Sequence, residues 1–150
     1  MGNIYFEDLR VGEFFWGDEV IVDPGEMLAY GKQNDPWPIH IDEDAAASSP
    51  FDGIIASGGY SITLMYRSLI GAYNTPERRW QFLGGFDWKL KFENPVRAGD
   101  RLRARLSVDK MTPSRKIGRG IVNSTIDVFN QDELTVLSNE IVFLLATRAS

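Results

Sequence analysis

The chain has 150 residues, of which 43% are hydrophobic and 25% are charged, and its formal net charge at pH 7 is −5. This length and composition predict a single globular domain, residues 1–150, with a hydrophobic core of its own. The acidic balance argues against a nucleic-acid-binding protein, which needs a basic face. The absence of cysteine excludes disulfides, thiol nucleophiles and zinc fingers.

The first ten residues are polar and acidic and lack the apolar core of a signal peptide. Met1-Gly2 begins like a myristoylation signal, but Phe6 occupies the position where serine or threonine is needed. No apolar run is long enough to span a membrane. We therefore expect a cytoplasmic protein without a membrane partner.

The first part of the chain predicts one strand and two short helices. Residues 13–22 are rich in aromatic and β-branched side chains, which is typical of a strand. A helix is expected from its N-cap Asp23, with Pro24 at its first position, and should fray near Gly31. Residues 42–47 place three acids before three alanines, which predicts a short helix with its acids at the positive end. Because a solvated helix cap explains these acids better than a metal site, no metal is expected.

A segment stiffened by two prolines, Asp35-Pro36-Trp37-Pro38-Ile39-His40, ends in the only histidine of the chain. Histidine titrates near ~6.5, so it can donate or accept a proton at neutral pH. Each proline fixes its own φ and restricts the residue before it, which limits how Asp35 and His40 lie relative to each other. The pair is a candidate acid–base site. The alternative is a hydrogen-bonded loop histidine, which is the commoner role of such a residue.

A long, mostly buried helix is predicted over residues 57–73. Ser57 is a good N-cap, and apolar residues recur at helical spacing as far as Tyr73. Gly58 and Gly59 each cost about 1 kcal/mol relative to alanine in a helix, so their place in the first turn needs a reason. Two reasons remain open: close approach of a ligand to the backbone, or tight packing of the helix end on a strand.

The second half of the chain alternates between apolar and polar residues with a period of two, which predicts strands with one buried face. These strands are expected at residues 86–92, 101–108, 120–129 and 134–145. The arginines of the second strand are expected to form a solvated outer face rather than a polyanion site. The long helix is the obvious cover for the apolar face. In the first of these strands, the residues expected to lie under it are Phe86, Trp88, Leu90 and Phe92.

The proline-stiffened segment resembles the Asp-x-Asn-Pro-x-His motif of MaoC-like hydratases and dehydratases, the family of (R)-specific enoyl-CoA hydratases. Asp35, Pro38 and His40 match this motif at the family spacing. Trp37 stands where the family usually has asparagine, and it offers one N–H donor and a large ring instead. This departure either reshapes the acyl pocket or marks a site that has changed its role.

The likeness extends to Ser57-Gly58 at the start of the long helix and to residues 6–12 and 94–100. It implies an α+β fold of the hot-dog type, in which a curved antiparallel sheet wraps around a long central helix. Family members usually pair two such units, as a dimer or as a fused double domain. A chain of this length supplies one unit, so a homodimer or a higher homo-oligomer is expected.

The resemblance implies hydration of a 2-enoyl thioester or dehydration of the 3-hydroxyacyl form. The substrate is expected to be a small acyl thioester, usually of coenzyme A, and no separate cofactor is implied. Asp35 and His40 would hold a water and exchange protons with it. The N–H of Gly58 would stabilise the thioester oxygen, and Ser57 and Trp37 are further candidates for substrate contacts.

Two other functions remain open: a hot-dog acyl-CoA thioesterase and a non-catalytic module that binds acyl thioesters. Turnover of an enoyl thioester or of a saturated acyl thioester would separate the two enzymes, and binding without turnover would indicate the module. Arg115 and Lys116 are the candidates for contacts with the coenzyme A phosphates, because their loop is basic in an acidic protein. The alternative is that this loop is a solvated hairpin tip.

Overall fold

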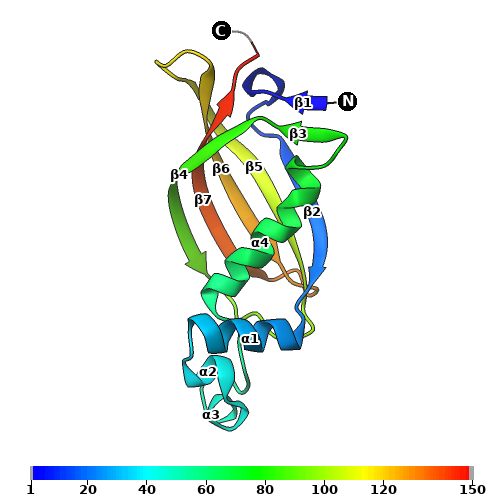
Figure 1. The fold of residues 1–150 in the computed structure, drawn as a ribbon, viewed down its shortest axis with the longest axis vertical. Helices are drawn as coiled ribbons and strands as arrows, with labels where there is room; N and C mark the ends of the chain where they lie inside the picture. Colours follow the sequence, from blue (N-terminus) through cyan, green and yellow to red (C-terminus); the bar gives the residue numbers. More distant parts are fainter. Residues whose placement is uncertain (1, 149–150) are drawn as a thin grey trace.

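A curved sheet of antiparallel strands carries one long helix on its concave face (Figure 1). The structure is a computed structural model and describes residues 2–148. The predicted α+β architecture, a curved antiparallel sheet wrapped around a long central helix, is confirmed. In order across the sheet, its five strands are β2 (Phe14–Ile21), β5 (Arg101–Pro113), β6 (Arg119–Phe129), β7 (Thr135–Ala146) and β4 (Phe82–Phe92).

The central helix α4 (Gly58–Tyr73) forms the middle of the core and packs chiefly on β2 and β5. The inward rows of β5 and β6 are buried at every second residue, as their period-two pattern predicted. The side chains of α4 that are almost completely buried against the sheet include Tyr60, Leu64, Met65 and Leu69.

The contact between α4 and β2 is close because a β-bulge in β2 brings its backbone to the helix. A Cβ atom on Gly17 would collide with the backbone carbonyl of Ser68, so only glycine fits there. The buried Ser68 hydroxyl donates to Asp18 O at 2.6 Å and accepts from Ala104 N at 2.9 Å. Ser68 therefore joins β2 and β5 at the position where the bulge interrupts their ladder.

The expectation for β4 was wrong in part. Trp88 and Leu90 are partly buried and pack against the core, but the side chains of Phe86 and Phe92 are 60% and 56% exposed. A register shift between Gly85 and Asp87 interrupts the alternation beside Phe86. In addition, β4 is an edge strand and α4 packs chiefly on β2 and β5, so the inward row of β4 is only partly covered.

Three shorter helices gather at one end of the sheet (Figure 1): α1 (Pro24–Asn34), α2 (Pro38–Ile41) and α3 (Glu43–Ala47). Asp23 caps α1 as predicted, by accepting a hydrogen bond from Glu26 N at 2.8 Å. The expectation that α1 frays near Gly31 was wrong, because the helix continues to Asn34. Gly31 packs against the backbone of His40, where a larger residue would be crowded, so packing accounts for a glycine inside the helix. The proline-stiffened segment, residues 35–40, is partly helical, because α2 begins at Pro38, and proline suits the first position of a helix.

The opposite end of the sheet carries a small parallel pair of strands, β1 (Gly2–Ile4) and β3 (Arg78–Trp80), beside the short 3₁₀ helix η1 (Phe6–Asp8). This pair was not predicted, because a strand of three residues leaves too short a pattern to read. Across residues 2–148, no helix is both long and apolar enough to cross a membrane.

The arginines of β5 form an outer face, as expected. Arg103 stacks over the ring of Trp16 with its guanidinium carbon 4.8 Å from the ring centroid. Arg105 lies 3.6 Å from the Asp127 carboxylate and also contacts Trp16. The Asp127 carboxylate and the Trp16 ring thus neutralise or cover the guanidinium groups of Arg103 and Arg105. These local contacts explain the two arginines without a polyanion ligand.

Candidate active site

The two residues of the candidate acid–base pair lie close together at the N-terminal end of α4. Asp35 is the C-cap of α1, and His40 belongs to α2. The distance between Asp35 Oδ2 and His40 Nε2 is 3.5 Å. The structure therefore brings together two side chains whose distance and relative orientation could not be predicted from the prolines alone.

The orientation of His40 is set by its second ring nitrogen. His40 Nδ1 lies 2.8 Å from the carbonyl oxygen of Ile55, which can only accept a hydrogen bond. The proton of the neutral ring is therefore on Nδ1, and Nε2 is an acceptor that faces the Asp35 carboxylate. Two acceptors 3.5 Å apart repel each other unless a proton lies between them or a water donates to both. The pair is thus built to hold a water or to share a proton.

Ser57 plays a different part from the one expected of an N-cap. It occupies the N-cap position of α4, but its side chain makes no capping hydrogen bond. Instead the hydroxyl donates to Asp35 Oδ2 at 2.7 Å, and the residue is only 3% exposed. Ser57 therefore orients the carboxylate of Asp35, a role that local sequence could not reveal because the two residues are far apart in the chain.

The two glycines of the first turn of α4 have different neighbours. A Cβ atom on Gly58 would lie 2.8 Å from the ring of Phe92, and a Cβ atom on Gly59 would collide with the Tyr30 hydroxyl. Tight packing therefore accounts for Gly59. At Gly58 a ring that is itself 56% exposed comes close, and the first backbone N–H groups of a helix have no intrahelical acceptor. Gly58 remains the candidate for contact with a ligand oxygen.

A hollow of about 370 Å³ opens beside this helix end. His40 and Gly58 both line it, and so does Ser61 one turn further along α4. The segment Asn94-Pro95-Val96, part of the sequence resemblance, forms another part of its wall. The hollow thus joins His40 and a helix N-terminus to room for a small ligand, whereas Asp35 contacts His40 but is not among the lining residues.

The other candidates are not among the residues that line this hollow: Ser57, Trp37, Arg115 and Lys116. The side chain of Trp37 is 66% exposed and is not among the residues that line the hollow. Arg115 and Lys116 lie between β5 and β6, at the end of the sheet opposite the short helices (Figure 1). The thirteen residues of β5 span roughly 40 Å at about 3.3 Å per residue, which separates that loop from His40 within one chain.

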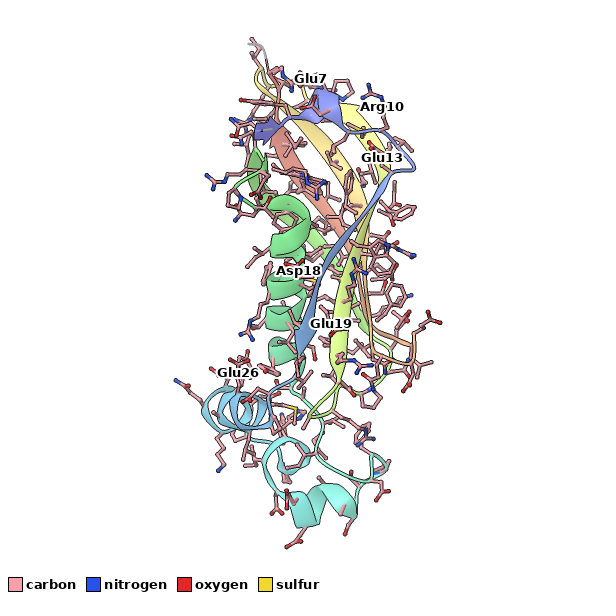
Figure 2. All side chains as sticks on the ribbon, turned by 90° about the vertical axis from the view of Figure 1, so that its right-hand side faces the viewer. Glu7, Arg10, Glu13, Asp18, Glu19 and Glu26 are labelled. Carbon is pink, nitrogen blue, oxygen red and sulfur yellow. The ribbon has the colours of Figure 1, made fainter. Side chains whose placement is uncertain are left out.

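A second group of polar residues, missed in the sequence, fastens α1 to α4. The Tyr60 hydroxyl donates to Glu26 at 2.6 Å, and Arg67 donates to the same carboxylate oxygen at 2.8 Å. Figure 2 shows Glu26 where α1 passes the lower end of α4. The hydrogen bonds from Arg67 and Tyr60 lower the pKa of the Glu26 carboxyl, whereas burial and this carboxylate raise the pKa of the Tyr60 hydroxyl. Because Asp35 ends α1, the contact also bears on the position of Asp35.

The sequence matches the family of MaoC-like domains over residues 15–129. Over 112 residues the chain is 30% identical to an (R)-specific enoyl-CoA hydratase of Rhodospirillum rubrum, and the match covers 75% of this chain and 74% of that protein. Asp35, His40 and Gly58 all fall inside the matched part of the chain.

The fold is also that of known members. The crystal structure of a MaoC-like dehydratase from Rhodospirillum rubrum superposes with a TM-score of 0.88 at 30% identity, covering 98% of this chain and 99% of that one. A Mycobacterium tuberculosis protein with a double hot-dog fold superposes with a TM-score of 0.78 at 20% identity, covering 99% of this chain and 45% of that one. This chain therefore belongs to the MaoC-like hydratase and dehydratase family and has the hot-dog fold.

Proposed function

We propose that the protein is a hydro-lyase that adds water to 2-enoyl thioesters or removes it from 3-hydroxyacyl thioesters. The observation that carries this proposal is the pair of facing acceptors, Asp35 Oδ2 and His40 Nε2, 3.5 Å apart at the start of α4. The similarity to the Rhodospirillum rubrum hydratase supports the same reaction class. Coenzyme A, as part of the substrate, is the carrier we expect.

In hydration, Asp35 and His40 each accept a hydrogen bond from one water. One of the two takes a proton as the water oxygen bonds to the β-carbon of the enoyl group. A proton then passes from the pair to the α-carbon, so that the elements of one water are added and the pair returns to its starting state. General acid–base catalysis of this kind contributes roughly 10²–10⁴-fold to the rate.

The backbone of α4 supplies the second part of the mechanism. As water adds, negative charge develops on the thioester oxygen, and the N–H of Gly58 at the helix N-terminus is suited to stabilise it. A donor that belongs to the backbone needs no reorganisation during the reaction. A side chain at Gly58 would collide with the Phe92 ring, which lies 2.8 Å from the position of a Cβ atom, so glycine is required there.

The protein is expected to act as a homodimer joined at the edge of the sheet. The edge strand β4 exposes Phe82, Leu83 and Phe86 by 50%, 51% and 60%. An exposed, apolar edge strand invites pairing with another strand, and a two-fold axis satisfies both edges at once. Sedimentation at micromolar concentration tests this expectation, and a monomer there would contradict it.

The carrier contact proposed for Arg115 and Lys116 requires a longer reach than one chain provides. Coenzyme A would have to extend from the site along the whole sheet to reach this loop. Alternatively, the loop would have to approach the site of another subunit. The double change Arg115→Ala with Lys116→Ala should raise KM for a coenzyme A thioester if the contact exists. An unchanged KM would leave the loop as a solvated hairpin tip.

The direct test of function is a turnover screen with 2-enoyl coenzyme A thioesters of graded length. Loss of the absorbance of the conjugated double bond, with formation of the 3-hydroxyacyl product, is the expected result. Hydrolysis of saturated acyl thioesters with release of the free thiol would indicate a thioesterase instead. Tight binding of thioesters with neither reaction would indicate a binding module.

A further inference from the structure

A second hollow, of about 230 Å³, lies beside the C-terminal half of α4, between the helix and the sheet. Among the residues that line it, none is acidic or basic. Met65 and Leu69 contribute from the helix, and Ile126 and Ile141 from the sheet. Half of the lining residues are aromatic, and these are Tyr66, Tyr73, Trp80, Phe82, Trp88 and Phe143.

The aromatic side chains of this hollow hold one another in place. The rings of Tyr66 and Trp88 have centroids 5.8 Å apart and are tilted by 49°. Trp80 contacts Tyr73 at 6.0 Å and Phe143 at 6.3 Å. Burial raises the pKa of the Tyr73 hydroxyl, so this phenol stays neutral in the physiological range. The hollow is therefore an uncharged pocket whose walls are largely rigid rings.

This pocket and the hollow at the candidate active site share no lining residue, but they are neighbours in both layers of the fold. On β4, Phe92 lines the hollow at the active site and Trp88 lines the aromatic pocket, about 13 Å apart at about 3.3 Å per residue. On α4, Ser61 and Met65 line the two hollows one helical turn apart, which is about 6 Å at 1.5 Å per residue.

We propose that the aromatic pocket binds the distal end of the acyl group and selects acyl groups that end in an aromatic ring. The inference rests on the proposed function, in which the thioester is held at Gly58 and the acyl group extends from there. A ring in this pocket gains offset and edge-to-face contacts with the surrounding rings that an alkyl chain does not make. The volume of about 230 Å³ also exceeds the roughly 150 Å³ that holds benzene in an engineered apolar cavity.

The test compares two coenzyme A substrates with the same number of carbons. One is a 2-enoyl thioester that ends in a phenyl ring, and the other ends in an n-hexyl chain. We expect kcat/KM to be about two- to tenfold higher for the phenyl substrate, the range that ring–ring contacts provide beyond area burial. Equal values, or a preference for the alkyl substrate, would overturn the proposal.

Variants of Tyr66 locate the preference in the pocket. Tyr66 is 48% exposed, so its replacement should not prevent folding. Tyr66→Leu should lower the phenyl preference, while Tyr66→Phe, which keeps the ring, should retain it. The matched control is Phe14→Leu, because Phe14 is an exposed aromatic residue opposite Ser107 on the other face of the sheet. A loss of preference in the control equal to that in Tyr66→Leu would contradict the assignment.

A binding measurement separates this inference from the proposed function. Saturated thioesters ending in phenyl or n-hexyl cannot be hydrated, and their binding can be followed by the change in tryptophan fluorescence, because two of the four tryptophans, Trp80 and Trp88, line the pocket. Tighter binding of the phenyl compound without turnover of any enoyl thioester would leave the pocket assigned and the hydratase function refuted. Turnover of enoyl thioesters without any phenyl preference in rate or binding would support the hydratase function and refute the assignment of the pocket. If Tyr66→Leu instead dissociates the oligomer and keeps the preference, the pocket belongs to a subunit contact and the proposal fails.

Discussion

The two ends of α4 differ in what they offer to a ligand. At the N-terminal end, glycine leaves the backbone bare, and Ser57, Asp35 and His40 surround it with polar groups. Along the C-terminal half, neutral aromatic side chains line an apolar pocket. Under the proposed function, chemistry and selectivity would reside in separate parts of one helix, so that changes at one end should leave the other intact.

The largest effect is expected from the acid–base pair. His40→Ala and Asp35→Asn should each lower kcat by orders of magnitude with a smaller change in KM, because proton transfer matters chiefly in the transition state. Steady-state kinetics with an enoyl thioester provide the measurement. The double variant should be little worse than the poorer single one, since in the proposed mechanism the two residues hold one water. Near-full activity of His40→Ala would remove the basis of the proposed mechanism.

An intermediate effect is expected from Ser57. Ser57→Ala removes the hydrogen bond to the Asp35 carboxylate, and hydrogen bonds to charged groups are worth about 1.5–3 kcal/mol. We therefore expect kcat to fall by roughly 10- to 100-fold, with Ser57→Thr restoring part of it. The control is chemical denaturation, in which the loss of this one hydrogen bond should cost no more than about 1.5–3 kcal/mol of unfolding free energy, with kcat taken per folded molecule. Unchanged kcat together with a large loss of stability would show that Ser57 serves packing alone.

Ser68 is the matched serine in the second half of the same helix. Ser68→Ala leaves Asp18 O and Ala104 N without their buried partner, which should cost about 1–3 kcal/mol of unfolding free energy. Chemical denaturation measures this loss, while kcat per folded molecule should stay the same. A large fall in kcat in the folded variant would contradict the separation of the two ends of α4.

The smallest effect concerns pH and the contact of Glu26 with Tyr60 and Arg67. The fold lowers the pKa of Glu26, so its contribution to stability is present above the ordinary value of 4.5 and is lost as pH falls through the folded pKa. Wild-type protein should therefore lose more unfolding free energy than Glu26→Gln between neutral and acidic pH. Denaturant titrations of both proteins at several pH values provide the test, and parallel curves would contradict it.

The sequence alone predicted the architecture, which is confirmed, and named the candidate acid–base pair, which stays a prediction. Period-two alternation in the second half, the apolar spacing of residues 57–73 and the prolines around Trp37 are local patterns, and local patterns survive folding. The same patterns misplaced Phe86 and Phe92, because a bulge and an edge position depend on neighbouring strands rather than on the strand itself.

Only the tertiary structure decided how the site is held together. The hydrogen bonds from Ser57 to Asp35 and from His40 to Ile55 join residues 22 and 15 positions apart, and the Tyr60–Glu26 bond joins residues 34 apart. No spacing rule reaches across such intervals. The aromatic pocket likewise gathers residues from α4 and from β3, β4, β5, β6 and β7, whose proximity follows from the curvature of the sheet around the helix. Local patterns determine which elements form, whereas packing between elements determines which side chains meet.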